Sequence, residues 1–237
     1  MYDILHKLKL HREDARLFTY WVVNALKTIN IQGITYLDLL EGSTQWYWGS
    51  DYFHGDLYEA EEIFKLVHEL TSNKLVFIKY PNGQVFEPIK PQKGQYFGKP
   101  IYHNNSIIIL LVNFIDNSIT LVGYQNDFKN SNILATIPLN EITDCYNLFL
   151  VDSPLLLARH GHDDIFDIIY PQKLSFKIGE RESFDHLDED KLYFSTWYED
   201  PNYREEVIVR DIATGEIIDT FKGSIKTMPN GEKWLLT

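Results

Sequence analysis

The chain is almost devoid of cysteine. One residue of 237, Cys145, carries a thiol, so neither an internal disulfide nor a thiolate metal site can form. Cys145 opens the apolar stretch 145–150 and has no His or Lys beside it to lower its pKa, which predicts a buried, unreactive thiol. A lone cysteine is also compatible with a reducing compartment.

Long hydrophobic runs are missing as well. The longest purely apolar run, Ile107–Val112, has six residues, whereas a membrane helix needs about 20. The first residues, MYDILHKLKLHRED, alternate apolar with charged side chains and lack the continuous apolar core of a secretory signal. These features predict a soluble cytoplasmic protein with no membrane partner.

Positive charge is scarce. The chain has 22 Lys and Arg against 34 Asp and Glu, a net charge of −12, which disfavours binding to phosphate backbones and to anionic membranes. We therefore expect no nucleic-acid partner. The acidic residues occur in small groups, which is typical of a solvated surface, and a docking patch for a basic partner is the alternative.

Local catalytic motifs are absent from the sequence. It has no G-x-S-x-G elbow, no phosphate-binding P-loop, no H-E-x-x-H and no G-x-G-x-x-G. We therefore predict no cofactor and no catalytic residue. An active site assembled from distant segments would leave no such motif, so an enzyme stays possible.

A repeated hairpin pattern is what the sequence does contain. Each copy is an apolar strand, a tight turn and a second apolar strand, and the copies cover Leu75–Ile89, Ile119–Ile137, Ile165–Ile178 and Val207–Phe221. The residues that enter the turns are separated by 44, 46 and 41 residues, a spacing typical of propeller blades. The abundance of aromatic residues, 15 Tyr, 14 Phe and 5 Trp, also favours half-buried sheets.

Another apolar segment precedes each hairpin and predicts a third strand. These segments are Ile63–Leu70, Ile107–Phe114, Leu155–His160 and Leu192–Glu199. The links to the hairpins are short and rich in turn-forming residues, so the pairing must be antiparallel. Each repeat is predicted to be an antiparallel meander of at least three strands.

The segment Asp56–Leu70 allows a second interpretation. Asp56 as N-cap and Glu59 three residues later match a capping box, and Ile63, Leu66, Val67 and Leu70 have the spacing of one helix face. The first half of the segment is therefore a helix or a strand. For the second half the repeat alignment favours a strand.

The two ends of the chain carry related patterns. Residues 13–21 match residues 189–197 at E-D-x-x-x-F-[ST]-x-W, which predicts a strand over Leu17–Val23, although a helix is possible there. Residues 228–236, MPNGEKWLL, form a turn followed by a strand with no hairpin after it. An isolated half-repeat is costly unless strands from both ends complete one unit.

These elements resemble those of β-propeller proteins. The P-N-G-x-K-W-L-L turn and strand, and the hairpin V-I-V-R-D-I-A-T-G-E-I at Val207–Ile217, are similar to blade elements found in many unrelated propeller families. The resemblance implies one all-β domain over residues 1–237, with five blades, one of them closed by strands from both termini. The W-D dipeptide and the paired glycines of kelch repeats are absent, so the resemblance implies no family function.

The densest aromatic and polar stretch is the predicted ligand-binding surface. In residues 46–56, WYWGSDYFHGD, we predict that Trp48, Asp51, Tyr52 and His54 border a functional face, since rigid aromatics beside Asp and His suit sugars and planar ligands. The alternative is structural: Trp46 and Trp48 alternate, so they share one side of a strand and can fill the space between neighbouring blades.

The segment Arg159–Asp164 is a weaker candidate. His160, His162 and two carboxylates lie within five residues, a set that can bind metals, but no further ligand can be named and a solvated turn is favoured. We therefore predict no metal site.

Two function classes follow from these patterns. The first is a non-enzymatic binding module that uses a propeller face or channel for a protein or small-molecule ligand; an inhibitor of a basic toxin is a special case. The second is a carbohydrate-active enzyme whose carboxylates come from several blades. The lack of any local cluster of catalytic residues favours the binding module.

Overall fold

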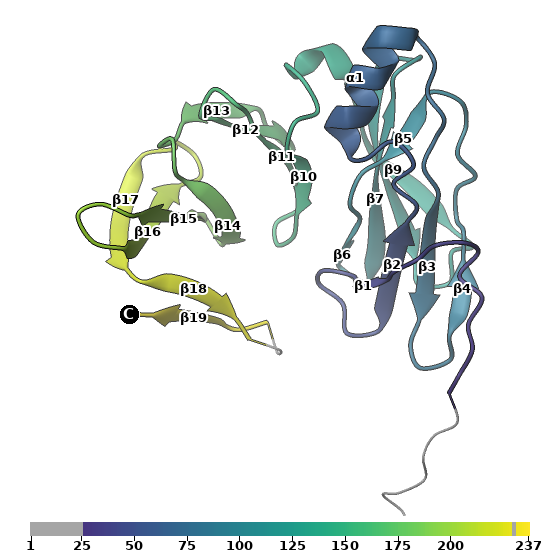
Figure 1. The fold of residues 1–237 in the computed structure, drawn as a ribbon, viewed down its shortest axis with the longest axis horizontal. Coiled ribbons are helices and arrows are strands. Elements are labelled where there is room, and N and C mark those ends of the chain that lie inside the picture. Colours follow the sequence, from purple (N-terminus) through teal and green to yellow (C-terminus); the bar gives the residue numbers. More distant parts are fainter. Residues whose placement is uncertain (1–25, 229–230) are drawn as a thin grey trace, which may run out of the picture. The chain divides into compact units, whose positions relative to one another are not determined.

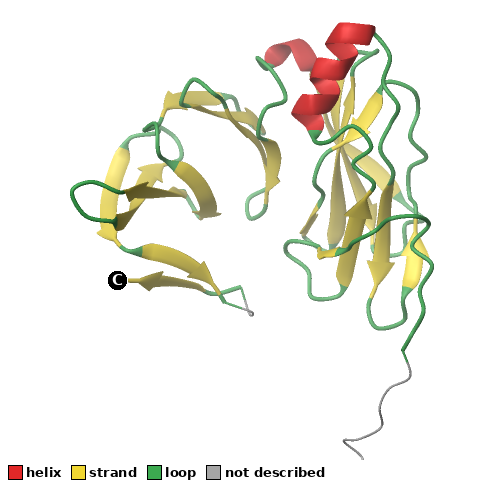
Figure 2. Cartoon of the chain, viewed as in Figure 1, coloured by secondary structure: helices red, strands yellow, loops and turns green. Residues whose placement is uncertain are grey.

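The computed structural model describes residues 26–228 and 231–237, and within it Ile31–Thr237 form one compact unit. The described part is all-β, with several antiparallel sheets and one α-helix (Figures 1 and 2). The predicted all-β class is therefore confirmed. No helix in the described ranges combines the length and the apolar character needed to cross a bilayer.

The first sheet pairs its strands in chain order. It contains β1 (Asp38–Leu39), β2 (Trp46–Ser50), β3 (Leu75–Lys79) and β4 (Gln84–Phe86). The hairpin predicted at 75–89 is confirmed as β3 and β4. The strand that precedes it is β2, so the prediction that Ile63–Leu70 supplies this strand is wrong.

The second sheet follows the same antiparallel meander with one additional strand. It contains β5 (Gln95–Phe97), β6 (Ile101–His103), β7 (Ser106–Asn113), β8 (Ser118–Gln125) and β9 (Ser131–Pro138), in the order β5-β7-β8-β9 with β6 also paired to β7. A 3-10 turn, η3 (Leu139–Glu141), leads out of it. The hairpin predicted at 119–137 is thus confirmed.

The third and fourth sheets are four-stranded meanders in chain order. The third contains β10 (Leu148–Val151), β11 (Leu156–His160), β12 (Ile165–Tyr170) and β13 (Leu174–Lys177). The fourth contains β14 (Ser183–Asp188), β15 (Lys191–Tyr198), β16 (Arg204–Asp211) and β17 (Ile217–Lys222). Both predicted hairpins and both predicted preceding strands are present.

The last two strands form a separate hairpin. β18 (Ser224–Thr227) pairs with β19 (Lys233–Leu236), with Ile225 opposite Leu235. The strand predicted within residues 228–236 is present as β19, and β18, which precedes the predicted turn, pairs with that strand. The strand predicted at Leu17–Val23 lies outside the described residues.

The helix α1 (Leu57–Val67) begins at the predicted capping box. The Asp56 carboxylate accepts hydrogen bonds from the N–H groups of Tyr58 and Glu59, and the Glu59 carboxylate accepts one from the Asp56 N–H. Such a reciprocal cap satisfies N–H groups that the helix itself cannot pair. The helix continues to Val67, into the segment Ile63–Leu70 for which the repeat alignment predicted a strand, and ends at His68, which has a left-handed backbone.

The buried face of α1 agrees with the predicted one only in part. Leu57, Ala60 and Glu61 are buried, whereas Leu66 is 80% exposed and Val67 60% exposed. Of the other predicted residues, Ile63 packs partly buried against the core, and Leu70, just beyond the helix, is buried in it. Helical spacing fixes which residues share a side, and tertiary packing fixes which side is covered.

The apolar run at 107–112 is explained by burial on both faces of β7. Ile107 and Ile109 pack in one core with Trp46 and Trp48, and Ile108 and Leu110 pack in another core on the opposite face. A strand covered on both sides has no solvent face and therefore reads as a continuous hydrophobic run. The shared burial of Trp46 and Trp48 confirms that they lie on one side of β2.

Candidate binding pocket

A pocket of about 630 Å³ lies among the third sheet, the fourth sheet, the β18–β19 hairpin and the loops that carry Glu41 and Lys99. We call it the inter-sheet pocket. Its lining combines apolar side chains, such as Phe149 and Phe184, with polar groups, such as Asp152 and Asp185. An apolar wall with a few convergent polar groups is the usual composition of a small-molecule site.

Three carboxylates of the pocket come from separate segments, and each has a basic partner. Asp152 Oδ1 lies 2.5 Å from His103 Nδ1, and Asp185 Oδ1 lies 2.8 Å from His186 Nδ1. Glu41 accepts a hydrogen bond of 2.8 Å from the Lys99 ammonium. These contacts fix the carboxylates while leaving each of them a further lone pair for a ligand.

Among the described residues, His160 lines the pocket without an internal hydrogen-bond partner for its imidazole. Its side chain is half-buried and makes no hydrogen bond or ion pair with the part of the chain that the structure describes. Burial lowers the pKa of His160, and this effect is larger than the opposing effect of the nearby Asp164. A neutral imidazole offers a ligand one donor and one acceptor nitrogen.

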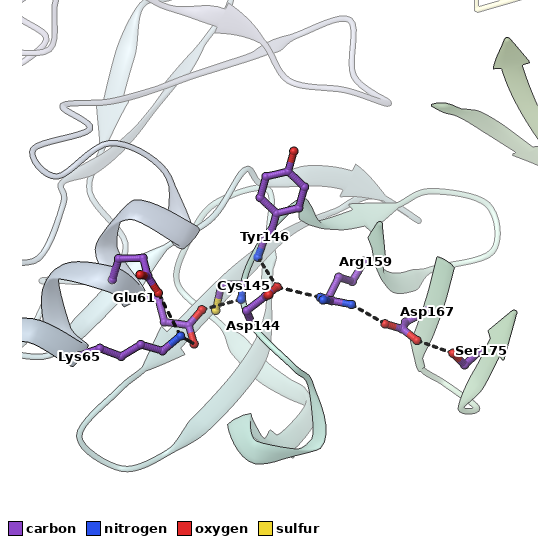
Figure 3. Close-up of polar contacts among 9 residues, drawn as sticks. Glu61, Lys65, Asp144, Cys145, Tyr146, Arg159, Asp167 and Ser175 are labelled. Carbon is purple, nitrogen blue, oxygen red and sulfur yellow. Dashed lines mark hydrogen bonds and ion pairs between the residues drawn. The ribbon is translucent and has the colours of Figure 1, made fainter. Parts of the chain in front are cut away.

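The strand that carries His160 is held from its other face by Arg159. Adjacent residues of a strand point to opposite faces, and the Arg159 guanidinium donates to Asp144 at 3.0 Å and to Asp167 at 2.8 Å (Figure 3). Ser175 in turn donates to Asp167. Arg159 is 2% exposed, so this paired cation fixes β11 directly behind the pocket.

The same polar chain continues to the helix. The Cys145 N–H donates to Glu61 at 2.6 Å, and Lys65 lies 3.0 Å from the other oxygen of that carboxylate (Figure 3). Burial raises the pKa of the Cys145 thiol, and the nearby Glu61 adds to this shift. The predicted burial of Cys145 is confirmed, since it is 1% exposed, and its lack of reactivity stays a prediction.

The four residues predicted to border a ligand surface lie outside this pocket. Trp48 is 3% exposed, so it belongs to the core, and its indole N–H is the one buried side-chain polar atom of the described residues without a hydrogen-bond partner. Asp51 is exposed and accepts from the Lys74 N–H at 2.9 Å. An exposed ligand platform at Trp48 is excluded by its burial.

Tyr52 and His54 are half-buried beside the same strand. The ring of Tyr52 is parallel to that of Tyr36 at a centroid distance of 6.0 Å, and burial raises the pKa of its hydroxyl. The His54 N–H donates to the Tyr96 hydroxyl, which donates to Gly55. A ligand-binding role for Asp51, Tyr52 and His54 stays a prediction.

The two histidines at the end of β11 separate in the structure. His160 faces the inter-sheet pocket, whereas His162 is exposed and stacks on Tyr146 with ring centroids 3.4 Å apart. Across the described residues, no three His, Cys, Asp or Glu side chains are grouped so as to hold a metal ion.

Sequence reasoning missed the pocket because its members share no local pattern. Asp152 lies in the β10–β11 turn, His160 ends β11 and Asp185 lies on β14. Strand alternation alone indicates which face of β14 Asp185 occupies, but only the packing of the sheets places it near His160. The segment around His160 was noticed for metal-binding residue types, not for this position.

Comparison with known proteins gives no family. No family model and no curated protein matches the chain. A solved structure of puromycin hydrolase is similar at 10% sequence identity with a TM-score of 0.42, over 85% of this chain and 33% of that one. The chain thus spans about a third of that protein's length, and a likeness this weak supports no inference about activity.

Proposed function

We propose that this protein is a non-enzymatic binding module whose inter-sheet pocket holds a small ligand. The observation that carries the proposal is the convergence of three carboxylates and the unpaired imidazole of His160 on one cavity of about 630 Å³. These polar side chains face an open cavity and not only their internal partners, which leaves room for a ligand. A half-buried imidazole without a partner retains hydrogen-bonding capacity that a ligand can satisfy.

The lining favours a ligand that donates hydrogen bonds beside an apolar group. The three carboxylates of Asp152, Asp185 and Glu41 outnumber the two ammonium groups of Lys99 and Lys233, and Phe149 and Phe184 contribute apolar area. An aromatic or aliphatic amine fits both features, because its ammonium donates to carboxylates and its hydrocarbon part contacts the phenyl rings.

Thermal-shift measurements with a library of small aromatic amines test this proposal. We expect at least one amine to raise the melting temperature of the wild type and to lose this effect in His160→Ala. His162→Ala is the matched control, because His162 is exposed and stacks on Tyr146 outside the pocket. The proposal fails if no amine stabilises the wild type, or if both variants respond equally.

A carbohydrate-active enzyme is the second candidate, favoured by one observation. Glu41, Asp152 and Asp185 come from three segments and line one pocket, which is the arrangement that a glycosidase built from several blades would need. Hydrolysis of nitrophenyl glycosides that is lost in Asp152→Asn and Asp185→Asn would support this candidate. If the wild-type protein shows no such hydrolysis, the enzyme candidate is rejected and the binding module is retained.

We further propose that the sheets are blades of a five-bladed β-propeller in which strands from both termini complete one blade. Four consecutive antiparallel meanders and a two-stranded remainder, β18 and β19, support this interpretation. A hairpin alone is marginally stable in water, and Trp234 and Leu236 of β19 are 50% and 48% exposed.

Deletion of Lys233–Thr237 tests this closure. In a completed blade the deletion uncovers an apolar face and a sheet edge, so unfolding in urea should become easier by several kcal/mol. Deletion of Thr237 alone is the control, since β19 ends at Leu236. An unchanged midpoint after the longer deletion would contradict the five-bladed closure.

A further inference from the structure

A second, smaller pocket is lined only by polar residues. Its volume is about 470 Å³, and it lies among Lys79 at the end of β3, the β6–β7 turn and the β8–β9 turn. Four of its residues carry amides: Asn104, Asn105, Gln125 and Asn126. We call it the amide pocket. It shares no residue with the inter-sheet pocket.

The amide of Asn126 is held in one orientation by two neighbours, the buried Trp46 and the half-buried Tyr102. Trp46 Nε1 lies 3.1 Å from Asn126 Oδ1, and the Tyr102 hydroxyl lies 3.0 Å from the same oxygen. An indole N–H can only donate, so the Asn126 atom that faces it must be the oxygen. Trp46 is 1% exposed, which makes this constraint rigid. The NH₂ group of Asn126 is consequently left as a donor.

In Asn104 the NH₂ group is engaged, whereas in Asn126 it is the oxygen. His103 Nδ1 lies 2.5 Å from Asp152, and His103 Nε2 lies 2.8 Å from Asn104 Nδ2. An amide NH₂ can only donate, so Asn104 donates to Nε2 of His103. Its oxygen is left as an acceptor.

The β6–β7 turn, which carries Asn104 and Asn105, has an unusual backbone geometry. Asn104 and Asn105 have φ values of 45° and 60°, the left-handed region that asparagine tolerates better than most side chains. Both follow β6 directly and lead into β7, whose interior is buried on both faces. The pocket therefore presents the oxygen of Asn104 as an acceptor and the NH₂ of Asn126 as a donor.

We propose that the amide pocket binds a neutral polyhydroxylated ligand, a saccharide, through paired hydroxyl groups. A hydroxyl both donates and accepts, so neighbouring sugar hydroxyls can satisfy the oxygen of Asn104 and the NH₂ of Asn126 together. The charged lining residues are one of each sign, Lys79 and Asp127, so no net charge on the ligand is required.

Other ligand classes fit the amide pocket less well. Lys79 is its one cation and lies over the Trp46 ring at 5.3 Å, in a chain of net charge −12, which disfavours a phosphate. No apolar side chain lines the pocket, which disfavours an aromatic ligand. Hydroxyl recognition by amides is the chemistry that remains.

The test is titration of ¹⁵N-labelled protein with D-glucose, D-galactose and N-acetyl-D-glucosamine, followed by the side-chain NH₂ resonances. At least one sugar should shift the NH₂ resonances of Asn126 and Asn104 in a saturable manner, while glycerol and D-sorbitol, as open-chain polyols, show whether the ring or only the diol is recognised. Saturation by the polyols alone would overturn the saccharide assignment, and the absence of any shift would overturn the site.

Asn126→Asp is the decisive variant. It keeps an oxygen for Trp46 and Tyr102 but removes the NH₂ donor, so the sugar should bind about tenfold more weakly. Asn117→Asp is the matched control, since Asn117 lies in the β7–β8 turn outside the pocket. Equal affinity of Asn126→Asp and wild type would overturn the proposal. His160→Ala, which tests the inter-sheet pocket, should leave sugar binding unchanged.

Discussion

The third and fourth sheets each bury one arginine and compensate its charge differently. Arg159 contacts two carboxylates, Asp144 and Asp167, with one hydrogen bond to each. Arg210 forms a bidentate pair with a single carboxylate, Glu182, at 2.8 and 2.7 Å, and also donates to the Gly215 carbonyl. In the fourth sheet one carboxylate therefore neutralises the buried arginine, whereas in the third sheet two carboxylates share this role.

The difference also extends to burial. The side chains of Arg210 and Glu182 are 8% and 9% exposed, whereas the carboxylates around Arg159 are 19% and 22% exposed. A buried charge that loses its partner is much more costly than one that water can reach. The third sheet should thus tolerate the loss of a partner better than the fourth, and the predictions below test this contrast.

The largest effect is expected for Arg210→Met. The variant leaves the buried Glu182 without its cation and should reduce the free energy of unfolding by about 3 to 5 kcal/mol. Urea denaturation measures the change. Arg181→Met is the control, because Arg181 makes no ion pair with any described residue and contacts only the rings of Trp197 and Tyr198. Equal losses in both variants would contradict the proposed importance of the buried pair.

A direct comparison of the two arginines comes from removing one negative charge from each. Glu182→Gln removes the single acid of Arg210 and should cost about 3 kcal/mol, whereas Asp167→Asn leaves Asp144 in place and should cost about 1 to 2 kcal/mol. Both are measured by urea unfolding at neutral pH. A larger loss of unfolding free energy in Asp167→Asn than in Glu182→Gln would contradict the proposed contrast between the two sheets.

The smallest effect concerns the pH dependence of the third sheet. Burial alone would raise the pKa of Asp144, but hydrogen bonds from Arg159 and the Tyr146 N–H outweigh it, so the pKa lies below its ordinary value of 3.8. A carboxylate with a depressed pKa stabilises the fold above its unfolded-state pKa and loses this contribution as the pH falls through the folded-state value.

Asp144→Asn should therefore have a shallower loss of stability below about pH 4 than the wild type. Because Asp144 is partly exposed, we expect the difference to be under about 1 kcal/mol. Urea denaturation at pH 5 and pH 3 measures it, with exposed Asp163→Asn as the control. Parallel pH profiles for Asp144→Asn and wild type would show that Asp144 carries no such contribution.

The hairpins could be predicted from the sequence because their signals are local. Apolar strands on either side of residues such as Asn82–Gly83 or Thr214–Gly215 leave little alternative to a tight antiparallel turn. The helix was also marked locally, by Asp56 and Glu59, but the repeat alignment was given more weight than the capping box for its second half. The hydrogen bonds of the capping box, and not the repeat alignment, correctly indicated that this segment is helical.

The two pockets could not be predicted in the same way. His160 and Asp185 are 25 residues apart in the sequence and belong to different sheets, and the orientation of Asn126 depends on Trp46, 80 residues earlier. No periodicity connects such residues. The two tryptophans of residues 46–56 instead reflect packing, since both are buried.

The order of the strands has a consequence for how the chain acquires its structure. The four larger sheets occupy successive segments, 38–86, 95–138, 148–177 and 183–222, with no strand exchanged between them. Contacts that are close in sequence cost little loop entropy and form early. Each sheet can therefore complete its backbone pairing as soon as its own segment has left the ribosome, in order from the first sheet to the fourth.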